Sequence, residues 1–396
     1  MTRAQALAGI RVLDLGEIMQ APLAAQVLGD FGAEVIKVER GVNGDMMRSL
    51  DRRAVEEGEP CSYFVAVNRN KRSVGLNLKT REGMAALHRL LERTDVLVHS
   101  YRPAAVRRLG LTYEELSERY PKLVYASASG FGETGPYAHK AGQDMLAQSL
   151  SGMARTVGDP NLAAHIMPVP VVDYASGMAL AQGILAALLE RERSGCGQKV
   201  SVNLLDTALA LQTLECSSVL MNGRTTNWVT DWYSGVFETK DGMVTVLGLF
   251  RENALRLLCE ALEVDDLSRR PEFATADLQA RNKERANEVL RDVVRGLTTE
   301  EAIERFDSVD LLSAPLLTLD EALHHPQVLE NGTITRVEVG GRASTRILGN
   351  PVRLSCTPAT ITRGVADVGQ HTEPVLREFG FTESEIDALR QSGSLR

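Results

Sequence analysis

Short apolar runs alternate with amphipathic segments through roughly the first 220 residues of the chain. Near-continuous apolar runs predict strands of a parallel sheet, because helices cover both faces of such sheets in α/β proteins. The segments between them repeat their apolar positions at helical spacing, and the first begins with proline and ends with glycine. The predicted strands are 10–15, 33–39, 95–100, 122–129 and 198–205, and the predicted helices are 22–32, 80–93, 113–120, 175–193 and a segment ending near Met221.

The pattern changes after Asn222. Two alternating runs within 235–249 meet at Asp241-Gly242, a dipeptide that favours tight turns, and predict a hairpin. We infer an α/β fold in which residues 1–224 and 316–396 build a large domain with a parallel sheet, and residues 225–315 form a smaller inserted α+β domain. The other predicted elements are helices at 251–262, 282–296 and 300–306, strands at 333–339 and 345–355, and helices near 373–379 and 383–391.

The length and charge of the chain agree with this division and narrow the function. A chain of 396 residues exceeds what one simple core usually holds, which favours two domains. The net charge of −8 disfavours nonspecific binding of nucleic acids. Residues 69–140 nevertheless carry 13 Lys and Arg against 7 Asp and Glu. This basic segment is either a solvated surface or a site for a polyanionic small molecule.

Other patterns indicate the compartment and the chemistry that we do not expect. The sequence has no run of 18 apolar residues, and its N-terminus lacks the apolar core of a signal peptide. We therefore predict a cytoplasmic protein without a membrane span. Five scattered cysteines, and seven histidines without an H-x-x-x-H pair, predict neither a disulfide framework nor a bound metal.

A glycine-rich run follows one of the predicted strands. The segment "SGFGETGP" contains G-x-G-x-x-G at Gly130, Gly132 and Gly135, a pattern found in dinucleotide-binding folds. In those folds the glycines open a helix, whereas Pro136 and Gly142 interrupt any helix here, so we predict no nicotinamide cofactor. These glycines remain compatible with a turn that a ligand approaches closely.

Cations gather in two short segments of the basic region. Lys71 and Arg72 lie in "VNRNKRSVGLNL", while Arg102, Arg107 and Arg108 follow a predicted strand in "SYRPAAVRRLG". Open α/β sheets bind ligands at the carboxyl ends of their strands, and arginine suits the geometry of phosphate groups. The three arginines are therefore candidate phosphate contacts, whereas Lys71 and Arg72 are either phosphate contacts or a charged entry to a strand.

One acid lies at the start of a predicted helix. Asp173, in "PVPVVDYASGMALAQG", separates an apolar run from an apolar helix. An acid at this position usually caps the helix by accepting a backbone N–H bond. It is also the best-placed candidate nucleophile, because the chain has no G-x-S-x-G serine motif and indicates no Cys–His pair. Free N–H groups at a helix start keep a carboxylate ionised, so the two roles are compatible.

Six blocks, in order along nearly the whole chain, resemble the family III CoA-transferases, a group that includes formyl-CoA and carnitine CoA-transferases and the α-methylacyl-CoA racemases. The blocks are "GIRVLDLGEIMQAPLAAQVLGDFGAEVIKVER", "NRNKRSVGLNL", "DVLVHSYRPAAVRRLGL", "YASASGFGETGPYAHKAGQDMLAQSLSG", "PVVDYASGMALAQGILAALLERERSGCGQKVSVNLLDTAL" and "VGQHT". The resemblance implies a Rossmann-like large domain, an interlocked homodimer and Asp173 as the catalytic nucleophile. It implies transfer of CoA to a small carboxylic or dicarboxylic acid through mixed-anhydride and aspartyl-CoA thioester intermediates, with succinyl-CoA as a candidate donor.

One departure separates the branches of that family. Racemases carry a titratable histidine where this chain has Gln143, and proton abstraction beside a thioester needs such a group. The transferase branch is therefore favoured. An acyl-CoA isomerase or epimerase on the same fold and a noncatalytic CoA-binding protein are the alternatives.

The resemblance also implies which residues contact the substrates. CoA contacts are implied for Ile18, Met19, Gln20, Arg40, Lys71, Ser100, Tyr101, Arg108 and Lys140, and charge alone adds Arg72 and Arg102. Contacts with the acceptor acid or a developing oxyanion are expected for Gln143, Gly248, Gly132, Arg48 and Tyr63.

Overall fold

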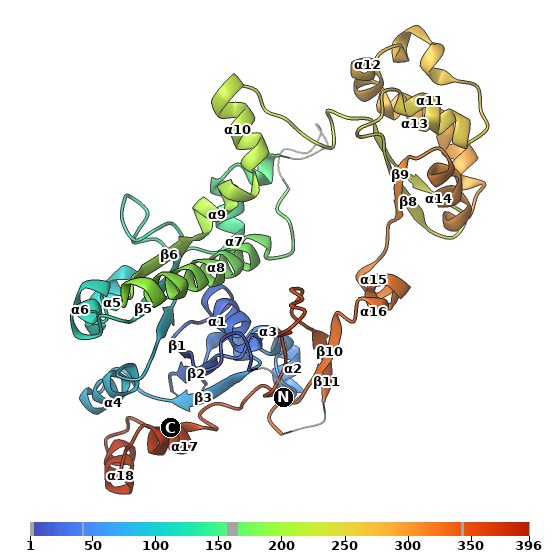
Figure 1. Ribbon diagram of the computed structural model, residues 1–396. Coiled ribbons are helices and arrows are strands. Elements are labelled where there is room, and N and C mark those ends of the chain that lie inside the picture. Colours follow the sequence, from blue (N-terminus) through green and yellow to red (C-terminus); the bar gives the residue numbers. More distant parts are fainter. Residues whose placement is uncertain (1–3, 42, 157–164, 342–343, 396) are drawn as a thin grey trace. The chain divides into compact units, whose positions relative to one another are not determined.

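The computed structural model describes residues 4–41, 43–156, 165–341 and 344–395, which form two compact units (Figure 1). The larger unit combines Met1–Met153, Ile166–Leu211 and Gly332–Arg396, and the smaller unit combines Ala154–His165 and Gln212–Asn331. The larger unit therefore combines N-terminal and C-terminal segments of the chain.

The boundaries of the smaller unit differ from the predicted 225 and 315. The segments on either side, α10 (Thr213–Asn222) and the pair α15 (Leu319–His324) and α16 (Pro326–Glu330), contain no buried residue among those described. Their apolar side chains are exposed, as Leu220 and Leu319 illustrate. Because these helices add apolar positions without joining a core, the hydrophobic pattern does not reveal the boundary.

A six-stranded parallel sheet forms the centre of the larger unit, as the apolar runs predicted. Its order is β3-β2-β1-β4-β5-β6, so the direction in which strands are added reverses between β1 and β4. The strands are β1 (Arg11–Asp14), β2 (Glu34–Glu39), β3 (Lys71–Gly75), β4 (Val96–His99), β5 (Val124–Ser129) and β6 (Lys199–Asn203).

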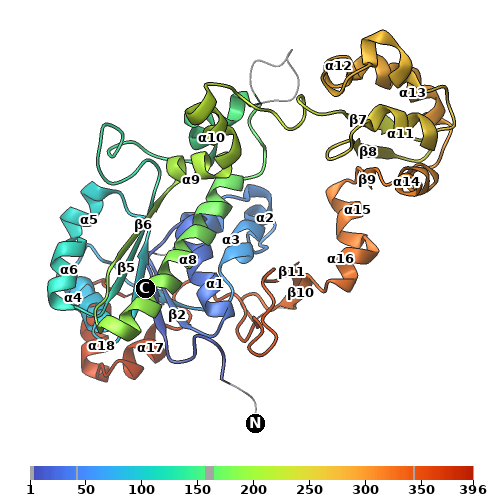
Figure 2. The same ribbon diagram turned by 45° about the horizontal axis from the view of Figure 1, so that its top comes forward.

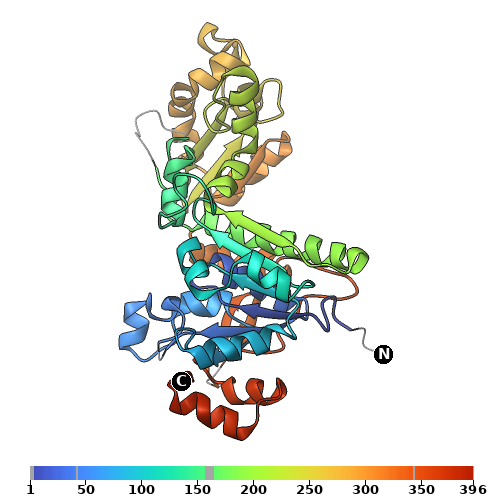
Figure 3. The same ribbon diagram turned by 90° about the vertical axis from the view of Figure 1, so that its left-hand side faces the viewer.

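Successive residues of these strands face two different cores, which is why the runs are apolar throughout. Val12 packs into one core with α1 (Gln20–Asp30) and α8 (Val171–Ser194), which lie side by side on one face (Figure 2). Leu13 packs into the other core, which α4 (Arg81–Leu91) shares with the C-terminal helices α17 (Thr372–Glu378) and α18 (Glu383–Gln391) (Figure 3). The C-terminal part thus completes the larger unit with helices.

Shorter elements connect these layers. An antiparallel pair, β10 (Ile334–Val337) and β11 (Thr345–Leu348), replaces the longer strands predicted in the tail. The backbone N–H of Gly349 still donates to the carbonyl of Thr333 at the end of this pair. The remaining helices of the larger unit are η1 (Met46–Ser49), α2 (Arg52–Glu56), α3 (Ser62–Val67), α5 (Pro103–Leu109), α6 (Tyr113–Arg119), α7 (Asp144–Leu150), η2 (Met153–Arg155, which reaches into the smaller unit) and α9 (Leu204–Leu211).

The smaller unit has its own core around an antiparallel sheet of order β7-β8-β9. The predicted hairpin is present as β7 (Ser234–Glu238) and β8 (Met243–Leu247), and β9 (Leu312–Pro315) adds a strand that the pattern did not predict. Buried Phe237 and Phe306 pack within this core. The other elements are α11 (Ala254–Ala261), η3 (Leu267–Arg269), η4 (Pro271–Phe273), α12 (Ala276–Arg281), α13 (Lys283–Arg295) and α14 (Thr299–Ser308).

Helix α8 is long and apolar enough to cross a membrane by the criteria of length and composition. Core helices of soluble proteins meet the same criteria, and α8 packs along α1 and against β5 and β6. Its apolar character is explained by this packing.

Candidate active site

The larger unit contains a cavity of about 420 Å³ beside the carboxyl ends of β1, β4 and β5. The sheet reverses its strand order between β1 and β4, which is where open α/β sheets place their ligands. The walls come from the loops after these strands and from the segment that leads into α8. Among the described residues, no group of three His, Cys, Asp or Glu side chains is placed to hold a metal ion.

Most of the residues singled out in the sequence line this one cavity. Asp173 lies at the start of α8, and Gln143 lies just before α7. The other predicted residues in the lining are Ile18, Met19, Gln20, Ser100, Tyr101, Arg102, Gly132 and Lys140.

Asp173 does not cap its helix, so that expectation was wrong. It is the third residue of α8, after Pro170 at the N-cap position. The cap comes from Asp144, whose Oδ2 accepts hydrogen bonds from the backbone N–H groups of Val172 at 2.7 Å and Asp173 at 2.9 Å. Because Asp144 satisfies these donors, the carboxylate of Asp173 is left to face the cavity.

The surroundings of Asp173 raise its pKa to about 6. Burial is the main cause, since it disfavours the charged form, and the negative charge of Asp144 acts in the same direction. A hydrogen bond from the side chain of Gln20 opposes both by lowering the pKa. The carboxylate is therefore more basic than usual, yet it is mostly ionised at neutral pH.

A close helix contact brings Gln20 to this carboxylate. Gly177 lies one turn after Asp173, and a Cβ atom there would be 2.9 Å from the carbonyl oxygen of Gln20 and 3.1 Å from the Cβ of Leu23. The glycine thus lets the first turn of α1 approach α8. Sequence reasoning missed this role, and also missed Asp144 and Glu17 in the cavity wall.

The glycine-rich run closes a loop and opens no helix. A Cβ at Gly130 would lie 2.4 Å from the Cα of Gly142, so the two backbones touch and only glycine fits at either position. Gly132 and Gly135 have positive φ angles of 93° and 84°, which L-residues rarely adopt. The loop runs from β5 to α7, and its ends are joined by this contact.

Residues 7–372 match the model of the family described as CoA-transferase family III. The chain belongs to this family. The match spans both units and includes every residue that lines the cavity.

Several proteins similar to this chain are named as CoA-transferases. The chain is 32% identical to a succinyl-CoA:glutarate CoA-transferase of Mus musculus, over 98% of this chain and 89% of the relative. It is also 32% identical to a succinate–glutarate CoA-transferase of Agrobacterium fabrum, over 95% and 96%. A solved CAIB/BAIF family protein of Brucella suis matches with a TM-score of 0.84 at 25% identity, over 95% of this chain and all of that one. The chain is therefore an enzyme of the CoA-transferase type.

In the structure Lys71 and Arg72 lie outside the cavity lining and have protein partners, and their expected phosphate contacts stay a prediction. The ammonium of Lys71 is buried and donates to Asp14 Oδ2 at 2.9 Å, to the carbonyl of Pro22 and to Asn68 Oδ1. Burial lowers its pKa to about 8. Arg72 forms a bidentate ion pair with Glu378 of α17 and a second ion pair with Glu34. Both cations hold elements of the fold together.

Arg48 is also structural in this family III protein. Its guanidinium binds both carboxylate oxygens of Glu39 at 2.8 Å and lies 3.7 Å from the ring centroid of Phe64. Arg40 pairs with Glu17, which lines the cavity, while Arg108 and Tyr63 are exposed. Among the described residues, the cavity lining does not include Arg40, Arg48, Tyr63, Lys71, Arg72, Arg108 or Gly248.

Gly248 has a packing explanation within the smaller unit. Its backbone N–H donates to the carbonyl of Tyr233 at 2.9 Å, and a Cβ there would lie 2.2 Å from that of Ala254. The N–H group is therefore already bonded in this conformation. Its role toward an oxyanion stays a prediction.

Proposed function

We propose that this family III enzyme moves CoA from an acyl-CoA donor to a free carboxylic acid, with Asp173 as the nucleophile. The observation that carries the proposal is a carboxylate of raised pKa in a cavity whose rim carries the cations Arg102 and Lys140. A more basic carboxylate is a better nucleophile, and partial burial strips it of the water that would weaken its attack.

The transfer occurs in two halves. An oxygen of Asp173 attacks the thioester carbonyl, the C–S bond breaks, and CoA leaves as a thiolate from a mixed anhydride. The thiolate then attacks the aspartyl carbonyl, which releases the donor acid as a carboxylate and leaves an aspartyl-CoA thioester. A second carboxylate attacks this thioester and the same steps run in reverse, so the new acyl-CoA leaves and Asp173 is regenerated.

The rim supplies groups suited to CoA. Lys140 lies 3.6 Å from the ring centroid of Tyr137, and Arg102 is exposed at the start of α5. These cations suit the phosphates of CoA, and Ser100 and Tyr101 lie beside them in the wall. Arg40 and Arg108 are exposed, and we retain them as outer contacts of the nucleotide.

The relatives suggest the substrate class. Both curated relatives cited above are named for succinate or succinyl-CoA and glutarate, so we propose succinyl-CoA as donor and a dicarboxylic acid as acceptor. Gln143 lines the cavity as a neutral hydrogen-bonding group. Because an amide cannot take a proton at physiological pH, Gln143 supports binding of the acceptor and does not support isomerisation.

Exposed apolar side chains support the homodimer. Helix α10 carries Leu214, Val219, Leu220 and Met221, with exposed fractions from 45% to 85%. Helices that expose several large apolar residues on a soluble protein commonly belong to an interface. We propose that a second copy of the chain covers them.

The test is CoA exchange measured with isotope-labelled acids. The enzyme is incubated with succinyl-CoA and a panel of labelled carboxylic acids, and hydroxylamine is added to trap a thioester or anhydride at Asp173 for mass spectrometry. We expect Asp173→Ala to lower exchange by about 10⁴-fold or more, because the substitution removes the carboxylate that would carry the acyl and thioester linkages. Asp292→Ala, which changes an exposed acid of the smaller unit, is the control. Full exchange in Asp173→Ala would refute the mechanism.

A further inference from the structure

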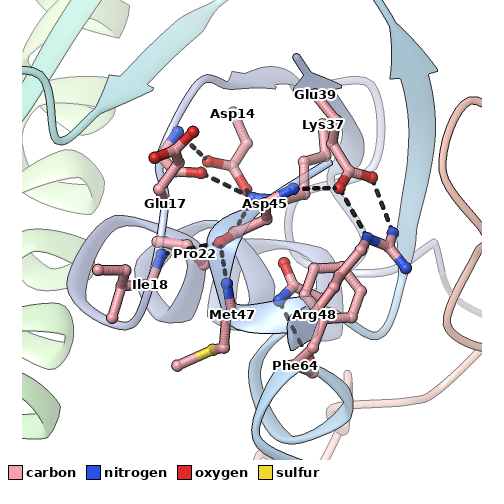
Figure 4. Close-up of polar contacts among 12 residues, drawn as sticks. Asp14, Glu17, Ile18, Pro22, Lys37, Glu39, Asp45, Met47, Arg48 and Phe64 are labelled. Carbon is pink, nitrogen blue, oxygen red and sulfur yellow. Dashed lines mark hydrogen bonds and ion pairs between the residues drawn. The ribbon is translucent and has the colours of Figure 1, made fainter. Parts of the chain in front are cut away.

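A cluster of buried charged side chains lies beneath the loop that joins β1 to α1 (Figure 4). We call Asp14, Lys37, Asp45 and Lys71 the charge cluster. Their side chains are at most 2% exposed. Lys37 Nζ lies 2.9 Å from Asp45 Oδ2 and 3.7 Å from Asp14 Oδ2, and Lys71 Nζ lies 2.9 Å from the same Asp14 oxygen. Such groups stay buried only when their charges and hydrogen bonds are met.

The charge cluster binds the backbone of the loop at successive positions. Asp14 Oδ1 accepts from the N–H of Gly16 at 2.8 Å, and Lys37 donates to the carbonyl of Gly16 at 2.7 Å. Asp45 Oδ1 accepts from the N–H of Ile18 at 3.2 Å. Lys71 donates to the carbonyl of Pro22 at 2.7 Å. Each charged side chain therefore fixes part of a segment that lines the cavity.

The conformation of Ile18 requires such support. Its φ is +68°, in the left-handed region, where a β-branched residue is strained. A loop free to relax would move Ile18 out of this region. The bond from its N–H to Asp45 is the direct restraint in Figure 4, and Lys37 holds Asp45 in place through the ion pair.

An outer layer of bonds keeps Asp45 oriented. Glu39 Oε2 accepts from the backbone N–H of Asp45 at 2.9 Å, while Arg48 and the hydroxyl of Ser73 hold Glu39. Asp45 Oδ1 also accepts from the N–H of Met47 at 2.9 Å. Arg48, which was expected to contact substrate, thus acts on the loop from a distance.

Two residues beyond Ile18 the chain reaches Gln20, the first residue of α1, which lines the cavity together with Asp173. Gly177 lets this turn approach α8, and the Gln20 side chain acts as a donor that lowers the pKa of Asp173. The geometry points to Asp45 as a positioning residue that holds Ile18 in its left-handed conformation and thereby sets Gln20 against Asp173. This inference rests on the proposed role of Asp173 as nucleophile. The carbonyl oxygen of the Gln20 side chain is buried without a hydrogen-bond partner among the described residues, so the position of this amide depends on the backbone that carries it.

The decisive measurement is the pKa of Asp173 in variants of the loop. Gln20 lowers that pKa, so displacing Gln20 raises it. We expect Asp45→Ala to raise the pKa of Asp173 by about half a unit, the same shift that we expect for Gln20→Ala, and to lower kcat about 10-fold with a smaller change in KM. The carboxylate is followed by NMR on protein labelled with ¹³C-aspartate and assigned with Asp173→Asn. This titration needs no turnover.

Two double variants separate positioning from general damage. In the Gln20→Ala background the side chain that Asp45 would position is already absent. Adding Asp45→Ala should therefore change kcat by less than about 3-fold. Ile18→Gly adopts the left-handed conformation without strain, so Asp45→Ala should cost less kcat in that background. Asp51→Ala, which removes the N-cap of neighbouring α2, is the matched control and should leave the pKa of Asp173 unchanged.

The outcomes are distinguishable from those of the proposed function. A wild-type enzyme without CoA exchange would refute the transferase mechanism, while the titration would still report whether Asp45 positions Gln20. An unchanged pKa of Asp173 in folded Asp45→Ala would overturn the inference even if exchange is normal. Should Asp45→Ala not fold, Asp45→Asn keeps the acceptor for Ile18 but weakens the ion pair with Lys37. A smaller upward shift is then expected, and no shift would overturn the inference.

Discussion

Asp14 and Asp173 are both shielded from water in the larger unit, yet their neighbours move their pKa values in opposite directions. Asp14 is fully buried beside Lys37 and Lys71, which hold its pKa below the ordinary value against the effect of burial. Asp173 has Asp144 as its charged neighbour and the neutral Gln20 as its hydrogen-bond donor, and its pKa rises to about 6. A buried carboxylate whose charge is balanced by neighbouring cations serves the structure, whereas one without a neighbouring cation stays reactive.

The largest effect expected on the Asp14 side is the loss of stability in Lys71→Met. Removing one partner of a buried ion pair leaves the other charge uncompensated, which typically costs about 3–5 kcal/mol. We expect urea denaturation to show a loss of that size in the free energy of unfolding. The KM for acyl-CoA in the folded fraction should change less than about 2-fold, because Lys71 does not reach the cavity lining. A large increase in KM with unchanged stability would restore Lys71 as a phosphate contact.

On the Asp173 side, Asp173→Asn should stabilise the protein at neutral pH. The pKa of this group is about 6 in the folded protein against an ordinary value of 3.8, so ionisation opposes folding. This cost is absent below about pH 4, grows between pH 4 and 6, and is complete above pH 6. Discounted for partial exposure to solvent, it amounts to about 1–2 kcal/mol. The gain in Asp173→Asn should therefore be seen by thermal unfolding at pH 7.5 and be lost at pH 4.

A smaller shift is expected from removing the like charge beside Asp173. Exchange should fall as the pH drops through about 6, because protonated Asp173 cannot attack the thioester. In Asp144→Asn this acidic limb should move down by about half a unit to one unit, since the repulsion disappears. The pH–rate profile measures the shift, and Asp206→Asn provides a control at an acid outside the cavity lining. If the acidic limb of the pH–rate profile is unchanged in Asp144→Asn, Asp144 acts only as a helix cap.

The smallest effect expected is on CoA affinity. Lys140→Met should raise the KM for acyl-CoA about 3- to 10-fold with little change in kcat, because the proposed contact with a CoA phosphate is lost. Lys79→Met removes an exposed cation from the same basic segment outside the cavity lining and is the matched control. Equal effects of the two substitutions would indicate that the positive charge of the whole segment attracts CoA and that Lys140 makes no specific contact.

The sequence was informative about elements and about the family, and less so about what each side chain faces. Apolar runs predicted five of the six strands, because strands covered on both faces must be apolar throughout. The strand β3 was considered only as an alternative to a phosphate site, because its residues Lys71–Gly75 begin with two cations. The same two cations were expected at the ligand, and the structure pairs them with Asp14 and Glu378.

The missed partners lie far away along the chain. Asp14 and Lys71 are 57 positions apart, and Asp144 caps a helix 28 and 29 positions further on. A local pattern shows that a charge exists, but its neighbour across the sheet or at a distant helix start is set by tertiary packing. Gly177 illustrates the same limit, because a glycine within a helix indicates a close approach without saying to what.

The contact between Gly130 and Gly142 makes the segment between them separable from the rest of the larger unit. Both ends are fixed where the backbones touch, so most side chains of 131–141 can change without disturbing β5 or α7. Glu133 is the exception, because it accepts from Ser127 of β5 and pairs with Lys199 of β6. Phe131, Gly132 and Lys140 of this segment reach the cavity wall. Replacing this segment with that of a relative that prefers another acyl group would therefore change part of the cavity wall and leave Asp173 in place.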